Sequence, residues 1–285
     1  MSDEPIALGR LPSLPIGEYH NGKCISHSSL EVFRERPQLY YRKFIAKTIP
    51  RTETPAMRIG SALHCAVLEP DTYASRYVVK PQGIDRRTTA GKAAFAAFEA
   101  EVGDKTILDA DESALVYNMT RAVMGNKSAA QLLAKGDAEV TWRAKSSSLP
   151  CPLQCRTDWF NAEGCELSGG RPYILDVKTT ASLDARSIRF LDRTFADWGY
   201  HRQIGFYVPL LYDCGVTCSD AFFVVVEKEE PFGCIVYRMS DAAIARGQDE
   251  TISDLQRLSR CFKTDTWPNL TEDIAEIGLP EYYDK

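Results

Sequence analysis

The stretch YILDVKTT, residues 173–180, has the apolar character of a buried strand but carries two charges. Side chains alternate between the two faces of a strand, so Asp176 and Lys178 point to one face while Leu175 and Val177 point to the other. A buried strand with an acid and a base on one face predicts a sheet with one chemically active side. The alternative is a solvated pair of charges on an edge strand.

A second carboxylate is expected close to Asp176. The segment LQCRTDWF, residues 153–160, predicts a strand interrupted by Asp158, and the polar, glycine-rich residues 161–171 can return the chain as a hairpin. Two carboxylates held together in a partly buried site repel each other unless one is protonated or a cation lies between them. Oxygen-liganded Mg²⁺ suits such a pair. The ammonium of Lys178 can then orient a water and stabilise charge on a phosphate.

The N-terminal half of the chain has helical patterns. Residues 1–24 hold three prolines and three glycines and predict an extended arm. Ser26 or Ser28 can cap a following helix, which Pro37 is expected to bend. Further helices are predicted over residues 57–68 and, two or three of them, over 92–135, with an exposed basic loop at 78–91.

The C-terminal half switches to strands at 138–144, 153–160, 173–180, 221–229 and 234–239, with helices at about 183–194, 199–213 and 240–262. This order favours an α/β (α+β) fold with a mixed central sheet. We therefore expect an N-terminal arm (1–24) and a single domain (25–285). Its parts are a helical annex, a catalytic core and a C-terminal tail, at 25–135, 136–263 and 264–285.

Four further residues are candidates for the site, although each has an ordinary structural explanation when taken alone. Glu139 lies on the first predicted strand, where it can simply face solvent. His64 follows Gly60 by four residues on one helix face, where a glycine lets another backbone or a ligand come close. Gln203 and Tyr207 share a face of the predicted helix 199–213 in the same way.

Taken together, these residues resemble a known motif set. G-x-x-x-H at 60–64, Glu139, Asp158, D-x-K at 176–178 and Q-x-x-x-Y at 203–207 are similar in order and type to the motifs of RecB-like nucleases of the PD-(D/E)XK superfamily. The segments SSLEVFRERPQLYYRKFI and GSALHCAVLEP resemble more specifically the RecE (exonuclease VIII) branch. The predicted strand order also agrees with the restriction-endonuclease-like αβββαβ core of that superfamily.

The resemblance implies a Mg²⁺-dependent exodeoxyribonuclease, with Mn²⁺ as a substitute, that degrades linear double-stranded DNA from 5′ to 3′. Asp158, Asp176 and the carbonyl of Val177 would bind metal. His64 would complete or border a second metal position, and Glu139 would hold metal or its water. Lys178 would position the water. The pair Gln203 and Tyr207 would contact the DNA backbone or brace the site.

The RecE resemblance also implies partners. These are double-stranded DNA ends, a single-strand annealing recombinase that uses the 3′ tails in phage-type recombination, and further copies of the chain in a ring, with a tetramer favoured. Basic residues expected to line the DNA path are Arg34, Arg36, Arg42, Lys43, Arg86, Arg87 and Arg202, although a solvated helix face explains them equally well. Two other functions stay open: a repair or CRISPR-adaptation nuclease acting on single strands, and a non-catalytic adaptor that binds DNA ends.

The composition limits the remaining possibilities. With 285 residues, 44% of them hydrophobic, the chain suits a soluble globular protein. No apolar run approaches the roughly 18 residues of a membrane span, and the first residues lack signal-peptide features, so we expect a cytoplasmic protein without membrane contact. The formal charge of −5 excludes a uniformly basic surface but not a local one.

The nine cysteines are expected to be reduced thiols. An iron-sulfur cluster is not expected, because Cys24 and the late cysteines lack compact spacing. Those late cysteines are Cys214, Cys218, Cys234 and Cys261. A zinc site is not expected either, because no histidine lies near Cys151, Cys155 and Cys165.

Overall fold

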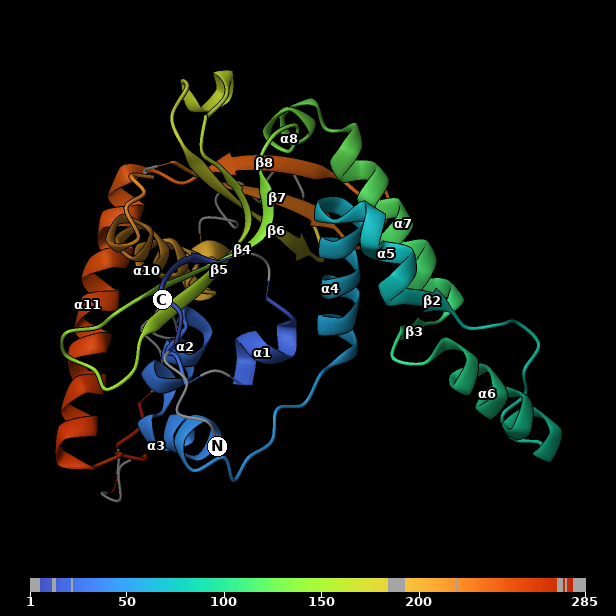
Figure 1. Cartoon of the computed structure of the whole chain (residues 1–285), viewed down its shortest axis with the longest axis horizontal. Helices are drawn as coiled ribbons and strands as arrows, with labels where there is room; N and C mark the ends of the chain where they lie inside the picture. The colour runs from blue at the N-terminus through green and yellow to red at the C-terminus, as the bar shows by residue number, and fades with distance from the viewer. Residues whose placement is uncertain are drawn as a thin grey trace.

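The computed structural model describes residues 6–11, 14–21, 23–183, 193–218, 220–270, 274 and 276–278. Its centre is a six-stranded sheet in the order β1-β4-β5-β6-β7-β8 (Figure 1). Strands β6 and β7 are parallel, and every other neighbouring pair is antiparallel, so the sheet is mixed as expected. The strands are β1 (Gly9–Leu11), β4 (Asp137–Ala144), β5 (Leu153–Asn161), β6 (Tyr173–Thr180), β7 (Asp220–Glu227) and β8 (Cys234–Arg238).

Helices cover both faces of this sheet. One apolar cluster joins the sheet to α2 (His27–Glu35), α10 (Tyr200–Asp213) and α11 (Asp241–Thr264). A second cluster joins the opposite face to α4 (Pro55–Leu68), α7 (Ala110–Gly125) and α8 (Lys127–Leu132). The two clusters bury the sheet as the central layer of an α+β fold.

Strand β6 shows the predicted alternation. Leu175 and Val177 lie in the cluster formed with α4, α7 and α8, whereas Ile174 lies in the cluster on the other face. Asp176 and Lys178 therefore project from the face covered by α10. The apolar residues thus fix which side of the sheet receives the two charges.

The remaining elements belong mostly to the N-terminal half of the chain. They are α1 (Ile16–Asn21), α3 (Pro37–Tyr40), a π-helical turn (Tyr41–Ile45), α5 (Pro70–Arg76), α6 (Thr89–Val102), a 3₁₀ turn (Glu166–Ser168) and the small parallel sheet of β2 (Tyr77–Val79) and β3 (Thr106–Leu108). Ser26 caps α2, and the chain turns before Pro37, as expected. In Figure 1, α6 projects away from the body of the molecule.

The segment predicted as an extended arm contains two elements that the sequence pattern did not show. Strand β1 pairs with β4, and α1 follows it. Both are too short for a hydrophobic period to become visible, and the same holds for β2 and β3. Most of the helix predicted at 183–194, and part of the tail from residue 264, lie outside the described residues.

A contact between two glycines sets the position of α10 against α11. A Cβ atom at Gly205 would lie 2.2 Å from the carbonyl carbon of Gly247, and one at Gly247 would lie 1.9 Å from the carbonyl oxygen of His201. The backbones therefore approach more closely than side chains would allow. Among the described helices, none is long and apolar enough to cross a membrane.

Candidate active site

Asp158 lies at the point where β5 and β6 separate. The last residues paired between these strands are Trp159 and Leu175, so continuing the register would place Asp158 opposite Asp176. Instead, the Asp158 carboxylate accepts a hydrogen bond of 2.9 Å from the backbone N–H of Val177. A side chain therefore replaces the backbone hydrogen bond that the strand pairing would otherwise make here. The predicted hairpin brings Asp158 and Asp176 to the same end of the paired strands.

Glu139 lies on the neighbouring strand β4. The pairs on either side of it, Ala138 with Trp159 and Val140 with Thr157, place Glu139 opposite Asp158. Its φ is +53°, a left-handed conformation that is uncommon for a side chain of this size. Strained backbone of this kind concentrates at functional sites, where surrounding contacts hold it.

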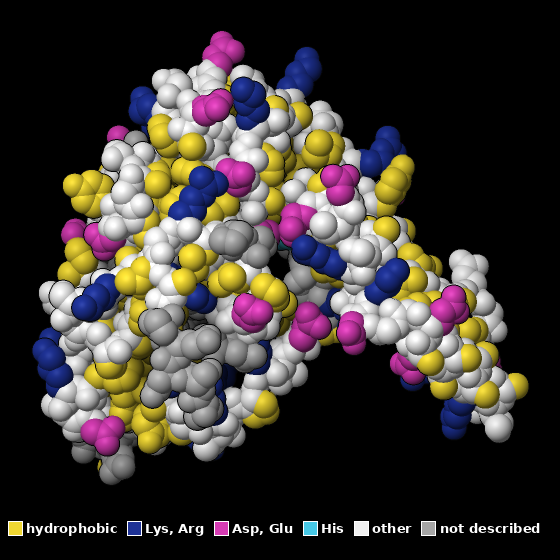
Figure 2. All heavy atoms as spheres, viewed as in Figure 1, with side chains coloured by type: hydrophobic (Ala, Val, Ile, Leu, Met, Phe, Trp, Pro, Cys, Tyr) yellow, Lys and Arg dark blue, Asp and Glu magenta, His cyan; other side chains and the backbone are white. Residues whose placement is uncertain are grey.

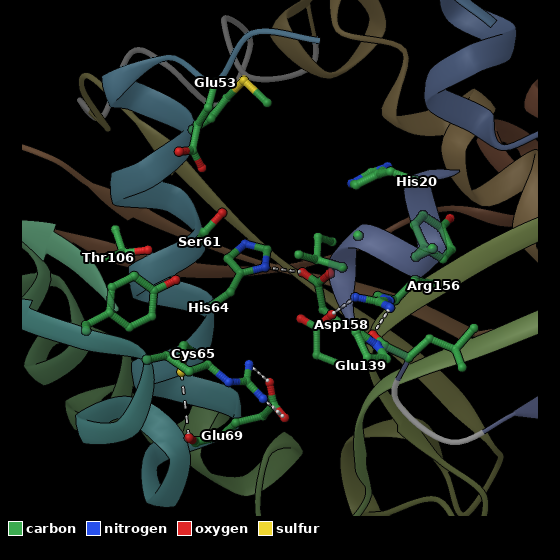
Figure 3. A pocket seen from close by; sticks show the side chains of 18 of the residues that line it. His20, Glu53, Ser61, His64, Cys65, Glu69, Thr106, Glu139, Arg156 and Asp158 are labelled. Carbon is green, nitrogen blue, oxygen red and sulfur yellow. Dashed lines mark hydrogen bonds and ion pairs between the residues drawn. The ribbon is translucent and has the colours of Figure 1, made fainter. Parts of the chain in front are cut away.

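His64 reaches the same point from helix α4. Its Nε2 lies 2.9 Å from the carbonyl oxygen of Val177, which can only accept, so Nε2 donates. Its Nδ1 lies 3.4 Å from Asp158 Oδ2. The imidazole thus bridges a carboxylate and a carbonyl oxygen, and Figure 3 shows its contact with Asp158. A Cβ atom added at Gly60 would have no protein neighbour within 4 Å. The glycine therefore faces open space, and no other segment of the described chain packs against it.

Three side chains form a group able to hold a metal ion. One ligand atom from each of His64, Glu139 and Asp158 lies within 4.8 Å of the other two. Burial and the charge of Asp158 raise the pKa of Glu139 to about 7, and burial and Asp176 raise that of Asp158. Burial disfavours the His64 imidazolium, but the surrounding carboxylates outweigh it and raise its pKa. The raised pKa values show that the nearby cations do not fully offset burial and mutual repulsion of the carboxylates, and a divalent metal would stabilise their charged forms.

Asp176 lies outside that group because its carboxylate has other partners. One oxygen contacts the ammonium of Lys178, and the other accepts a hydrogen bond of 2.6 Å from Gln203 Nε2. Gln203 Nε2 also lies 3.4 Å from the hydroxyl of Tyr207. Gln203 therefore braces Asp176, whereas Tyr207 contacts Gln203 and lines the cavity above the metal group.

A cavity of about 1310 Å³ opens above His64, Glu139 and Asp158. Helix α4 forms one wall, and residues 14–20 form the opposite one (Figure 3). On the molecular surface this region is hollowed, with acidic and basic side chains around it (Figure 2). The candidate metal group is thus reached from solvent through a cavity rather than from a flat surface.

Arg156 is a residue of this cavity that the sequence did not single out. It lies two positions before Asp158 on β5, and its guanidinium is 3.4 Å from Glu139 Oε2. It also donates to the carbonyl of Leu14 and lies 4.6 Å from the ring centroid of Tyr19. The two-residue spacing to Asp158 was the available signal, because it places both side chains on one strand face.

The predicted DNA-contacting residues are spread over α2, α10, the π-helical turn and the segment before α6. Arg34 pairs with Glu250 and Asp254, and Arg202 pairs with Glu31 and Glu250, so both hold helices together. The other five are Arg36 at the end of α2, Arg42 and Lys43 on the π-helical turn, and Arg86 and Arg87 before α6. Arg86 stacks on Phe95, and Arg87 pairs with Asp85. No member of the set lines the cavity.

The protein is thus an α+β domain in which two carboxylates and a histidine are grouped for a metal ion beside a buried lysine. A family model described as a PDDEXK-like domain of unknown function (DUF3799) matches residues 26–279. The chain therefore belongs to this family, within the PD-(D/E)XK superfamily.

A solved structure of a putative exonuclease supports the same fold. A putative exonuclease from Eubacterium rectale is 11% identical, with 93% of this chain and 94% of that chain covered, and the TM-score is 0.60. The structure of SSO0001 is 14% identical over 69% of this chain and 86% of that one, but its TM-score of 0.27 is too low to bear on the fold. No curated protein matches the chain significantly.

Proposed function

We propose that this protein is a Mg²⁺-dependent exodeoxyribonuclease of the RecE type. It would degrade linear double-stranded DNA from 5′ to 3′ and leave 3′ single-stranded tails for a strand-annealing recombinase. The observation that carries the proposal is the group His64, Glu139 and Asp158 lying beside the Lys178–Asp176 pair. Membership of the PDDEXK-like family and the fold shared with a putative exonuclease support it.

The metal would be held by His64, Glu139 and Asp158, with the carbonyl of Val177 and the carboxylate of Asp176 next to them. When bound, Mg²⁺ neutralises the carboxylates, acidifies water and offsets charge on the phosphate oxygens; Mn²⁺ is expected to substitute for it.

The chain's own residues supply the rest of the chemistry. Lys178 stays charged in its buried position because the charges of Asp176 and Asp158 outweigh the cost of burial and raise its pKa. A fixed ammonium can orient the attacking water and stabilise negative charge as the phosphodiester is cleaved. Gln203 holds Asp176 in place and so fixes the partner of Lys178.

The size of the cavity supports cleavage of one unpaired strand at the site. Pockets for drug-sized ligands occupy roughly 300–1,000 Å³. A cavity of about 1310 Å³ exceeds that range, so it has room for a few nucleotides of a single strand. We propose that a duplex end separates before the cut strand reaches Asp158 and that the chain assembles into a ring to hold such an end.

Digestion of linear DNA tests the function. We expect Mg²⁺ to release acid-soluble nucleotides from the 5′-ending strand of a labelled duplex, and EDTA to abolish the release. Preferential digestion of a matched single strand would favour the repair or CRISPR-adaptation alternative. Absence of cleavage under varied salt, Mg²⁺ and Mn²⁺, together with retained binding to DNA ends, would favour the adaptor.

A further inference from the structure

The wall of the cavity opposite α4 carries positive charge. His20, Arg51 and Arg156 line the cavity on that side, from α1, from the connection that precedes α4, and from β5. On the α4 side Glu53 and Glu69 line the cavity, and Arg76 pairs with Glu69 there (Figure 3). The guanidinium groups of Arg51 and Arg156 are the cations that the α1 side offers to a polyanion.

Arg156 is buried without being fully satisfied. Its side chain is only 10% exposed, and its Nε has no hydrogen-bond partner in the described part of the chain. Two of its contacts, the Leu14 carbonyl and the Tyr19 ring, are uncharged, and the carboxylate of Glu139 is 3.4 Å away. Glu139 also belongs to the candidate metal group, so metal binding would draw that carboxylate away from the guanidinium.

His20 and Arg51 continue the charged surface outward. Burial, Arg51 and Arg156 together lower the pKa of His20 to about 4, so the imidazole is neutral at physiological pH. Arg51 is exposed and forms no ion pair with any residue that the structure describes. Two cations and a neutral imidazole that can donate one hydrogen bond match the oxygens of a phosphate.

We propose that Arg156, Arg51 and His20 form a subsite for a backbone phosphate next to the one that is cleaved. The ligand class is a single-stranded nucleic-acid backbone, and the inference rests on the proposed nuclease function. Arg156 then has two roles: it holds Glu139 in its strained conformation and it contacts the substrate. Residues 14–20 become part of the substrate site, because Leu14 and Tyr19 hold Arg156.

Salt-dependent binding tests the subsite. Binding of a fluorescent single-stranded oligonucleotide is measured by anisotropy in EDTA across a series of KCl concentrations. For single strands the logarithm of affinity falls with the logarithm of salt by about 0.7 for each phosphate contact. We expect Arg51→Ala and Arg156→Gln each to bind about tenfold more weakly and to reduce this slope by about 0.7. Arg121→Ala, which removes an exposed arginine of α7 outside the cavity, should keep the wild-type slope.

The results of this experiment distinguish failure of the subsite proposal from failure of the nuclease proposal. If both variants keep the wild-type slope while the wild-type protein cleaves DNA, the subsite is wrong and the nuclease proposal stands. If the wild-type protein binds the strand with the expected slopes but never cleaves it, the nuclease proposal is wrong and the binding site stands. Arg51 is exposed, so its variant stays informative even if Arg156→Gln fails to fold.

Discussion

The ammonium of Lys178 contacts the carboxylate of Asp176 across one intervening residue of strand β6. Both project from one face, while Val177 between them packs into the opposite apolar cluster. Its backbone nevertheless belongs to the site: the N–H donates to Asp158, and the carbonyl accepts from His64. Three polar contacts therefore depend on the register of this one strand.

Replacement of Lys178 should abolish cleavage without abolishing binding. Lys178→Ala removes the ammonium that orients water and stabilises charge, and such groups contribute about 10²–10⁴-fold in rate. The rate of cleavage of labelled linear duplex in Mg²⁺ should fall by that factor, while the dissociation constant for the same DNA changes little. Lys92→Ala, at an exposed position of α6, serves as the control. Cleavage at the wild-type rate by Lys178→Ala would remove Lys178 from the mechanism.

The metal-free protein should lose stability as pH rises from about 4.5 to about 7. The pKa of Glu139 is about 7 in the folded chain against 4.5 in the unfolded one. A raised folded pKa favours folding fully below pH 4.5, and that contribution is lost as pH rises through about 7. At pH 8 the loss, relative to pH values below 4.5, amounts to about 3 kcal/mol, since the two pKa values differ by about 2.5 units and each unit corresponds to about 1.4 kcal/mol.

Urea unfolding at pH 5 and pH 8, with and without Mg²⁺, measures this effect. Glu139→Gln should be more stable than the wild type at pH 8 in EDTA, and it should gain less from Mg²⁺. Glu163→Gln is a matched control, because that glutamate is exposed and pairs only with Lys135. Equal pH dependence in Glu139→Gln and the wild type would show that Glu139 carries no such cost.

Much of this site follows from the sequence because it depends on short-range patterns. The alternation in 173–180 fixes the faces of β6, and a connection of eleven residues brings Asp158 to Asp176. The left-handed φ of Glu139 could not be predicted, because nothing in a glutamate favours it. Arg156 was missed because an arginine in a strand usually faces solvent, and its partners Leu14 and Tyr19 are more than 130 residues away.

Long separation in sequence also hid the ion-pair partners of the surface arginines. Arg34 finds Asp254 at a separation of 220 residues, and Arg202 finds Glu31 at a separation of 171. Such pairs depend on how α2, α10 and α11 pack, which periodicity does not reveal. The DNA path predicted through these arginines stays a prediction, and the cavity wall at Arg51 offers a different route.

Gln203 and Tyr207 should differ in importance. Gln203→Ala removes the 2.6 Å hydrogen bond to Asp176 and leaves a buried carboxylate with one partner fewer, at a cost of about 1–3 kcal/mol. Tyr207→Phe removes only a hydroxyl 3.4 Å from Gln203. We expect cleavage to fall about tenfold or more in the first variant and much less in the second. An equal loss in Tyr207→Phe, seen as weaker DNA binding, would instead indicate direct contact with the substrate.

Close packing of α10 on α11 should control both stability and cleavage. Gly247→Ala would place a methyl group 1.9 Å from the carbonyl oxygen of His201, and overpacking of this kind costs about 1–3 kcal/mol or more. Because α10 carries Gln203, displacement of the helix should also disturb the bond to Asp176. The midpoint temperature of thermal unfolding and the cleavage rate, measured on the same preparation, should therefore both decrease. Gly125→Ala on α7, where an added methyl group meets open space, should leave both unchanged. If Gly247→Ala is as stable as the wild type, α10 and α11 can move apart without loss of stability.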